Sequence, residues 1–374
     1  MCMEEVELEI QSLAATGAGV GTVEEKGMKR PVFVYYTVPG DIVRVRITKQ
    51  HKKYYEAELI EIVKESKSRI KPVCKHFGEC GACDWLHIRY GEQIKAKEQL
   101  LRLFFKRNSI ELGKIEIIKA DKTLNYRDKI RVDGESRYCF YARASNKTVP
   151  IERCYIINDE LNRIFGLKPD KKGEKSFAYD YKTKNIVKEG EKAYYYFEDI
   201  KFAYLTGSFA QSNTEMNRRL IKEVFGEAEG KDILELYAGN GNFTIPLSRK
   251  SEKITAVEGD KNSYEMLKYN MKENRSANIS AYRDDVRWFL KKNSGKMWGC
   301  IIIDPPRTGA GDIIEQIAKA TEKIIYVSCN AQELARDVKK IIPLGYEIKK
   351  VKLIDMFPQT RHFETLLVLN RKAF

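Results

Sequence analysis

The sequence predicts a mixed protein of three parts: an all-β unit, a central α+β unit and a C-terminal α/β unit. Short apolar runs separated by glycine and turn residues fill the first sixty positions, a pattern typical of a small β-barrel. Near the C-terminus, the apolar runs 232–236, 254–258 and 301–304 have strand length, and helical patterns lie between them. Strands that alternate with helices predict an α/β sheet. We place the boundaries at residues 1–63, 64–205 and 206–374.

Composition restricts the partners and the location of the protein. The 374 residues include 67 Lys and Arg against 53 Asp and Glu, giving a net charge of +14 and favouring a polyanionic partner. No apolar run reaches the roughly 20 residues that span a bilayer. The acidic start of the chain lacks the pattern of a signal peptide, so we expect a cytoplasmic location. Eight cysteines in such a chain favour metal binding or catalysis over disulfides.

The first unit carries glycine and turn signals of a barrel. Residues 4–62 contain about five apolar runs of strand length. Gly17-Ala18-Gly19-Val20-Gly21 and the turn Val38-Pro39-Gly40-Asp41 resemble the TRAM domain, an oligonucleotide-binding barrel attached to RNA-modifying enzymes. An ordinary barrel without an RNA role would carry similar signals.

A cysteine-rich segment opens the central unit. Cys74, Cys80 and Cys83 have the spacing C-x5-C-x2-C, which suits a soft metal or an Fe–S cluster that still needs a fourth ligand. Zinc and an Fe–S cluster both satisfy this spacing. The candidates for the fourth ligand are Cys154, Cys139, His76 and His87.

Two further segments of the central unit are rich in basic residues. Residues 88–108 predict a helix, either with a solvated basic face or packed on the C-terminal unit. Residues 125–132 predict a strand on which Arg127, Lys129 and Arg131 alternate with other residues. We expect the polar stretch 168–192 to form hairpin turns, with phosphate contact as the alternative.

The C-terminal unit begins with a glycine loop between a strand and a helix. Gly239 and Gly241 follow the first strand, and Glu258 ends the second strand, where a carboxylate can bind ribose hydroxyls. Thr244 stands where a dinucleotide fingerprint has its third glycine, which weakens the dinucleotide interpretation. The pattern is instead similar to S-adenosylmethionine (SAM) methyltransferases. In these enzymes an acid such as Asp284 or Asp285, with Asp285 favoured, meets the adenine ring.

A cysteine and a carboxylate at strand ends could perform covalent catalysis. Cys329 follows the apolar run 324–328, and a thiol there is either a small core residue or a nucleophile. Glu364 begins the last apolar run, where it is either an edge carboxylate or a general base. Asp304-Pro305-Pro306-Arg307 ends another strand, and DNA amino-methyltransferases carry a similar motif with an aromatic in place of the arginine.

Taken together, these motifs resemble the RNA uracil-C5 methyltransferase family over nearly the whole chain. The resemblance rests on Asp304-Pro305-Pro306-Arg307, on Ser328-Cys329-Asn330 and on the segment 355–364. It implies SAM as cofactor, Cys329 as nucleophile and Glu364 as general base. It also implies a [4Fe–4S] cluster with Cys154 as fourth ligand beside Cys74, Cys80 and Cys83. The implied SAM-binding residues are Gln211, Tyr237, Gly239, Asn242, Glu258, Asp285 and Asp304, and the implied RNA contacts are Arg127, Lys129 and Arg131.

The resemblance predicts a Rossmann-like class I methyltransferase unit and a monomer that methylates C5 of a uridine in RNA. We expect 23S rRNA as substrate, with the tRNA T-loop uridine as the alternative. A non-catalytic RNA-binding protein with a SAM pocket and a DNA methyltransferase are weaker alternatives. The C5-cytosine RNA methyltransferases use a second catalytic cysteine, whereas Cys300, the nearest other thiol, begins an apolar strand and is expected in the core.

Overall fold

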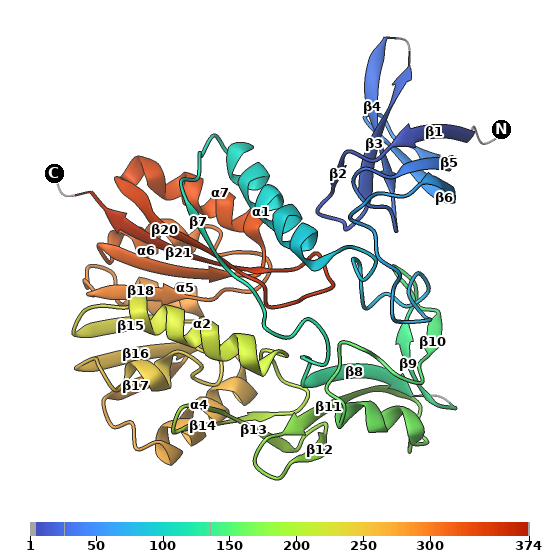
Figure 1. Cartoon of the computed structure of the whole chain (residues 1–374). Coiled ribbons are helices and arrows are strands. Elements are labelled where there is room, and N and C mark those ends of the chain that lie inside the picture. The colour runs from blue at the N-terminus through green and yellow to red at the C-terminus, as the bar shows by residue number, and fades with distance from the viewer. Residues whose placement is uncertain (1–4, 26, 135, 373–374) are drawn as a thin grey trace.

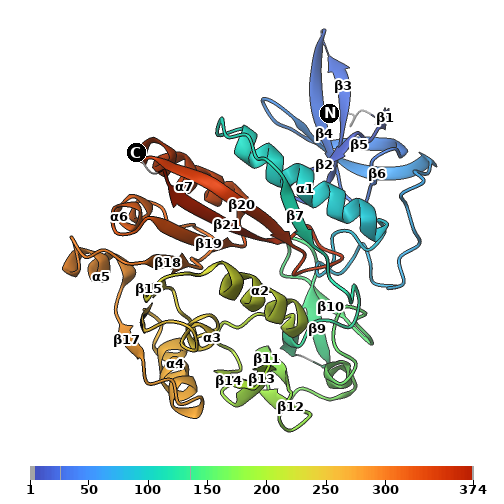
Figure 2. The same ribbon diagram turned by 60° about the vertical axis from the view of Figure 1, so that its left-hand side comes forward.

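The computed structural model describes residues 5–25, 27–134 and 136–372. An N-terminal β-unit stands apart from a large C-terminal sheet, and the central part joins the two (Figure 1). Seen from a second direction, helix α1 (Tyr90–Lys106) runs along the C-terminal sheet on the side nearer the N-terminal unit (Figure 2). No helix of the described residues is both long enough and apolar enough to cross a membrane.

The N-terminal unit is one curved sheet with its own core. Its strand order is β1-β5-β6-β4-β3-β2, antiparallel except for the pair β4–β6. Alternating side chains such as Leu8, Val32 and Val43 point inward and are almost fully buried. The strands are β1 (Glu5–Glu9), β2 (Ser12–Leu13), β3 (Gly19–Glu25), β4 (Met28–Val34), β5 (Ile42–Gln50) and β6 (Tyr55–Lys64).

The central part contains a five-stranded antiparallel sheet and a separate hairpin. The sheet has the order β10-β9-β8-β11-β12, and the hairpin pairs β13 with β14. The stretch expected to form hairpin turns contributes two of these strands. The elements are β8 (Lys129–Gly134), β9 (Tyr138–Tyr141), β10 (Thr148–Pro150), the 3-10 helix η1 (Leu161–Gly166), β11 (Gly173–Asp180), β12 (Asn185–Lys188), β13 (Lys192–Phe197) and β14 (Ile200–Leu205).

The C-terminal part is an eight-stranded sheet in the order β17-β16-β15-β18-β19-β21-β20-β7. The first five strands in this order are parallel to one another, and β21 is antiparallel to both its neighbours. The strands are β15 (Asp232–Leu236), β16 (Lys253–Glu258), β17 (Ile279–Arg283), β18 (Cys300–Ile303), β19 (Lys323–Ser328), β20 (Tyr346–Ile354) and β21 (Glu364–Arg371).

Helices cover both faces of this sheet, because its central strands are apolar on both sides. Residues of α2, α3 and α4 share one buried cluster with the sheet, and residues of α1, α5, α6 and α7 share the other. Cys300 is fully buried in the first cluster. The helices are α2 (Thr214–Glu227), α3 (Thr244–Leu247), α4 (Lys261–Glu273), α5 (Val286–Lys292), α6 (Ile313–Lys319), α7 (Ala331–Ile341) and the 3-10 helix η2 (Ile342–Leu344).

A segment from before the central sheet completes the C-terminal sheet. Helix α1 buries Leu101 and Phe105 in the cluster that contains α7, and strand β7 (Ile115–Ile118) pairs in parallel with β20. Residues 90–118 therefore pack with the last part of the chain, although they precede the central sheet in sequence. Local sequence pattern contains no signal for the pairing of β7, since that pairing depends on a strand more than 200 residues away.

Candidate active site

A cavity of about 710 Å³ opens at the edge of the C-terminal sheet where its parallel strands end. Open α/β sheets bind ligands at this edge. Eight of the residues proposed from the sequence line the cavity, and they come from six separate segments of the chain. They are Gln211, Tyr237, Gly239, Asn242, Glu258, Asp304, Cys329 and Glu364.

The loop after β15 brings backbone close to this cavity. Tyr237, Gly239 and Gly241 all have positive φ, and a Cβ on Gly241 would lie 2.8 Å from Leu267. The Gly239 N–H donates a hydrogen bond of 2.8 Å to the Glu258 carboxylate, which ends β16. The positive φ angles favour glycine at both positions. The hydrogen bond from Gly239 connects the loop to Glu258 at the end of the next strand.

Polar side chains of the same loop are held in a hydrogen-bonded group with Tyr195 and Asn217. The Asn242 amide oxygen accepts hydrogen bonds of 2.9 Å from the Tyr195 hydroxyl and from Asn217, and Asn217 accepts one from the Asn242 nitrogen. Asn240 contributes a further bond to the Ala203 carbonyl. This group fixes the wall before any ligand enters.

Asp285 lies outside the cavity wall that the other proposed SAM-binding residues form. It is not among the described residues that line the cavity. Its carboxylate caps α5 by accepting from the N–H groups of Arg287 and Trp288. Asp260 and Asn262 do line the cavity, although sequence reasoning did not single them out. Both begin α4, directly after the strand that ends at Glu258, and that position was the available signal.

Cys329 and Glu364 lie side by side because of the strand register. Strand β19 ends at Ser328, which pairs with Thr365 of the antiparallel strand β21. Extending this register by one residue places Cys329 opposite Glu364. Side chains of opposed residues point to the same face and lie close together. The register of β19 and β21 therefore brings together two residues that are 35 positions apart in sequence.

The cavity holds these two groups in their neutral forms. Burial, followed by the nearby Glu364 and Asp304 carboxyls, raises the pKa of the Cys329 thiol to about 11. Burial and then Asp304 raise the pKa of Glu364 well above its usual range. The Glu364 Oε2 atom is buried and has no hydrogen-bond partner among the described residues. An unpartnered buried carboxyl of this kind is available to a ligand.

The wall is acidic in a protein that is basic as a whole. Burial raises the pKa of Asp304 to about 7 and that of Glu235 to about 8, the latter despite a 2.5 Å hydrogen bond from Thr244. Arg307 is the one guanidinium in the described lining, and it lowers the pKa of Cys329 and of Glu364. The carboxyl side chains in the wall are Glu235, Glu258, Asp260, Asp304 and Glu364.

Arg307 and His362 also line the cavity beside Cys329, and sequence reasoning gave neither a role. The Asn330 side chain, next to Cys329, donates a 2.8 Å hydrogen bond to the Arg307 carbonyl. Burial, Arg361 and Arg307 lower the pKa of His362 to about 4, so its imidazole is neutral at pH 7. A second cavity of about 260 Å³ shares Arg307, Cys329 and His362 with the first and opens toward α1.

The four proposed cluster cysteines line another cavity, which is small and mostly apolar and lies in the central part. Burial and then the Cys154, Cys80 and Cys74 sulfurs raise the pKa of Cys83 well above its usual value. Burial also raises the pKa of Cys154 to about 11. Among the described residues, no three His, Cys, Asp or Glu side chains form a group that could hold a single metal ion. Cys139, on β9, does not line this cavity.

The three basic residues proposed as RNA contacts have different surroundings. The Lys129 ammonium donates to the Ser208 carbonyl and lies 5.5 Å from the centre of the Tyr204 ring. Burial, then Arg131 and Arg127, lower the pKa of Lys129 to about 8. Arg131 is exposed and lies 3.6 Å from Glu174, whereas Arg127 donates to the Lys129 carbonyl. Of the three, Arg131 alone is exposed.

The sheet order, the glycine loop after β15 and the acid at the end of β16 define a SAM-dependent methyltransferase of the α/β class. A family model described as tRNA (Uracil-5-)-methyltransferase matches residues 176–372, more than half of the chain, and a TRAM domain model matches residues 3–60. The chain belongs to the tRNA (uracil-5-)-methyltransferase family. The predicted family, fold class and enzyme class are confirmed.

Relatives match almost the whole chain. It is 26% identical to the 23S rRNA (uracil(1939)-C(5))-methyltransferase RlmD of Aliivibrio fischeri over 97% of this chain and 96% of the relative. It is 28% identical to RlmD of Shewanella halifaxensis over 98% and 95%. The solved tRNA (uracil-54, C5)-methyltransferase of Pyrococcus abyssi, in complex with S-adenosyl-L-homocysteine, has a TM-score of 0.77 at 20% identity and covers 97% of this chain and 100% of its own.

Proposed function

We propose that the protein methylates C5 of a uridine in 23S rRNA, with Cys329 as nucleophile and Glu364 as general base. The observation that carries the proposal is that Cys329 and Glu364 lie near each other in the wall of a 710 Å³ cavity that is also lined by the glycine loop. Cavities of several hundred Å³ hold cofactor-sized ligands. The two 23S rRNA enzymes are 26% and 28% identical to the chain and the solved tRNA enzyme is 20% identical, which favours rRNA over tRNA.

The two residues act on adjacent atoms of one uracil ring. The Cys329 thiol loses its proton to solvent as its sulfur bonds to C6, and the electrons of the C5=C6 double bond make C5 a nucleophile. Bound SAM supplies the methyl group that C5 accepts. Glu364 then removes the proton from C5, the S–C6 bond breaks and the double bond returns. The thiolate regains one proton, so the net reaction releases one proton.

Two opposing influences act on the ionisation that this chemistry needs. Burial keeps Cys329 and Glu364 neutral, whereas Arg307 favours the thiolate and the carboxylate. A ligand that carries positive charge shifts both groups in the same direction as Arg307 does, because opposite charges favour ionisation. The reactive forms are therefore favoured when the cavity is filled.

The acidic wall suits a positively charged cofactor. We assign SAM binding to the Gly239 loop, to Glu258 at the end of β16 and to Asp304 at the end of β18. Gln211, Tyr237 and Asn242 line the same cavity and complete the contacts. The sulfonium and ammonium groups of SAM are cations, and buried carboxylates bind cations strongly. Asp285 acts at a distance in this assignment, through the N-terminus of α5.

We assign a [4Fe–4S] cluster to Cys74, Cys80, Cys83 and Cys154. The donor set fits, because four thiols line one apolar cavity and mutual repulsion disfavours their ionisation unless positive charge lies between them. The four thiolates would hold the cluster, which is the ligand set that [4Fe–4S] clusters use. Methyl transfer moves no net electrons, which makes the cluster structural.

RNA binding completes the proposal. The net charge of +14, the N-terminal TRAM unit and the exposed Arg131 support contact with phosphates. Arg127 and Lys129 stabilise the region of β8 that carries Arg131, because their side chains donate to protein carbonyls. We further propose that the protein acts as a cytoplasmic monomer of units 1–63, 64–205 and 206–374, in which residues 90–118 of the middle unit pack on the last unit.

The test of the substrate is to map 5-methyluridine by mass spectrometry in total RNA from cells with and without the gene. The proposal predicts that one or more 23S rRNA positions lose the methyl group and regain it when the gene is restored. Loss confined to the tRNA T-loop would contradict the rRNA assignment. An unchanged 5-methyluridine map would contradict the proposed reaction in those cells.

A further inference from the structure

The backbone just before Glu364 is strained. Gln359 adopts a left-handed conformation with φ of 66°, which side chains with a Cβ rarely adopt. Such conformations persist only where surrounding contacts fix them, and they gather at functional sites. Only four residues lie between Gln359 and Glu364, so whatever holds this turn also sets the start of β21.

Two elements far away in sequence hold Gln359. Its carbonyl accepts hydrogen bonds from the backbone N–H groups of Asp84 (3.1 Å) and Trp85 (3.0 Å). Its backbone N–H and side-chain oxygen bond to the amide of Gln93 on α1, at 2.9 and 2.8 Å. Four hydrogen bonds therefore oppose relaxation of the turn.

The Asp84 side chain fixes the turn a second time. Its carboxylate accepts from the Arg361 guanidinium at 2.8 and 2.9 Å and from the Arg361 N–H at 3.3 Å. The Arg143 guanidinium donates to the same carboxylate. The Asp84 side chain is only 5% exposed, so these charge-assisted bonds form away from water and are strong.

Asp84 also touches the N-terminal unit. Arg143 stacks on the Tyr35 ring with 4.2 Å between the guanidinium carbon and the ring centre. Trp85 donates from its indole nitrogen to the Gly17 carbonyl at 3.1 Å. Asp84, which directly follows Cys83 in sequence, therefore fixes the turn before Glu364 through Arg361, and its partner Arg143 and its neighbour Trp85 contact the N-terminal unit.

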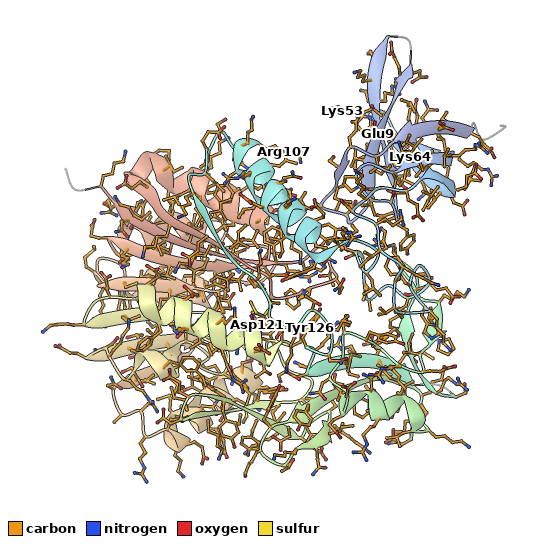
Figure 3. The ribbon with its side chains drawn as sticks, viewed as in Figure 1. Glu9, Lys53, Lys64, Arg107, Asp121 and Tyr126 are labelled. Carbon is orange, nitrogen blue, oxygen red and sulfur yellow. The ribbon has the colours of Figure 1, made fainter. Side chains whose placement is uncertain are left out.

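Other contacts anchor the same segment but farther from Glu364. Lys97 pairs with Asp355, and Asn213 donates to the Met356 carbonyl. The Tyr126 hydroxyl donates to the Pro358 carbonyl at 2.9 Å, and Tyr126 lies where the central and C-terminal parts meet (Figure 3). These anchors fix residues 355–358, whereas Asp84 fixes 359–361, immediately before the proposed base.

We propose that Asp84 is a positioning residue for the methylation reaction. It holds the turn 359–361 so that the Glu364 carboxyl faces the C5 proton after methyl transfer. The inference rests on the proposed role of Glu364. Asp84 reaches no substrate itself, and Cys329 depends on β19 and not on this turn. Loss of Asp84 therefore slows proton removal and leaves the earlier thiol addition less affected.

This difference gives a signature that a purely structural role would not produce. Enzyme that has added Cys329 to uracil but cannot remove the C5 proton stays covalently attached to RNA. We measure this adduct on denaturing gels after mixing enzyme, SAM and ordinary uridine RNA, together with kcat and the KM for RNA. The Glu364→Gln variant comes first and should accumulate adduct. If it does not, the proposed role of Glu364 fails, whatever Asp84 does.

The main variant is Asp84→Asn, which keeps the shape of the side chain and removes its charge. We expect kcat to fall by about 10- to 100-fold, the KM for RNA to stay within about threefold, and the adduct fraction to rise above that of wild type. Iron content is measured on the same samples, because Cys83 is the neighbour. Asp199→Asn is the matched control, since Asp199 pairs with Arg249 at the surface, and it should behave as wild type.

A second variant acts on the turn from the other side. Gln93→Leu removes the two hydrogen bonds to Gln359 from α1, away from the thiols, and should give the same fall in kcat and the same adduct. If Glu364→Gln accumulates adduct but Asp84→Asn and Gln93→Leu do not, the positioning role is wrong. A normal kcat in Asp84→Asn would also overturn it.

Discussion

Two cavities among the described residues bury ionisable side chains in different surroundings. The cavity at the sheet edge is large, open and lined by five carboxyl groups, of which Glu364 has an unpartnered oxygen among the described residues. The thiol cavity is small, and its wall is largely apolar around four cysteines. In both, burial raises the pKa of the buried acid, whether carboxyl or thiol.

The difference in size and wall indicates two kinds of occupant. An open acidic cavity can exchange a cationic cofactor for its neutral product at each turnover, because methyl transfer removes the sulfonium charge. A small apolar cavity lined by thiols suits a group that stays bound, since thiolates gain stability only while the metal is there. The first cavity should therefore govern rate, and the second should govern stability.

The largest effect is expected from Glu364→Gln. Without the carboxylate no group removes the C5 proton, so kcat should fall by about 10²- to 10⁴-fold. The measurement is transfer of labelled methyl from SAM to RNA under single-turnover and steady-state conditions. Iron content should equal that of wild type, because Glu364 does not line the thiol cavity. A variant with more than a tenth of wild-type turnover would contradict the general-base role.

Cys83→Ser should show the opposite pattern. Losing one thiol from the apolar cavity should release iron and lower the thermal midpoint by about 10 °C, as expected for the loss of a structural metal group. Cys139→Ser is the matched control, because Cys139 is a buried thiol of the same central part that lies on β9 and outside the cavity. Wild-type protein purified without oxygen should contain about four irons per chain. Stoichiometric zinc in place of iron would contradict the cluster assignment.

The free energy of unfolding should depend on pH differently in wild type and in Glu364→Gln. The folded state raises the pKa of Glu364 above its ordinary 4.5, so between these values the folded chain keeps a proton that the unfolded chain loses. The free energy of unfolding therefore falls by about 1.4 kcal/mol per pH unit across that window.

Glu364→Gln has no carboxyl at this position, so its free energy of unfolding does not fall in this way as pH rises. Its thermal midpoint should therefore exceed that of wild type at pH 7.5 and approach it at pH 4.5. Denaturation curves at a series of pH values measure the difference. An equal gap at every pH would mean that Glu364 does not retain its proton in the folded protein.

The smallest effect is expected from Asp285→Asn. Asp285 caps α5 and is not in the described lining, whereas Glu258 is in it. SAM affinity measured by calorimetry should fall less than about threefold in Asp285→Asn and at least tenfold in Glu258→Gln. Equal losses would show that Asp285 contacts the cofactor directly.

The sequence predicted the elements that depend on local pattern. The apolar runs that end at Glu258, Asp304 and Cys329 became strand ends at one edge of the sheet, since the carboxyl ends of parallel strands meet there. The helix expected over 88–108 is α1 (Tyr90–Lys106). These features follow from periodicity and turn residues, which act over a few positions.

Features that depend on distant parts of the chain were not predictable from pattern. The register that pairs Cys329 with Glu364, the addition of β7 to the sheet and the contacts of Asp84 all join segments far apart in sequence. In the local sequence, Asp84 cannot be distinguished from an ordinary polar residue that follows a cysteine. Its importance arises only where three parts of the fold meet.

The most direct test of the central claim uses RNA that contains 5-fluorouridine. Fluorine at C5 cannot be removed as a proton, so an enzyme that adds Cys329 to C6 and transfers the methyl group stays attached to the RNA. With SAM present, wild type should form a complex that survives denaturing electrophoresis, and Cys329→Ala should form none. A complex of equal yield with Cys329→Ala would contradict the account.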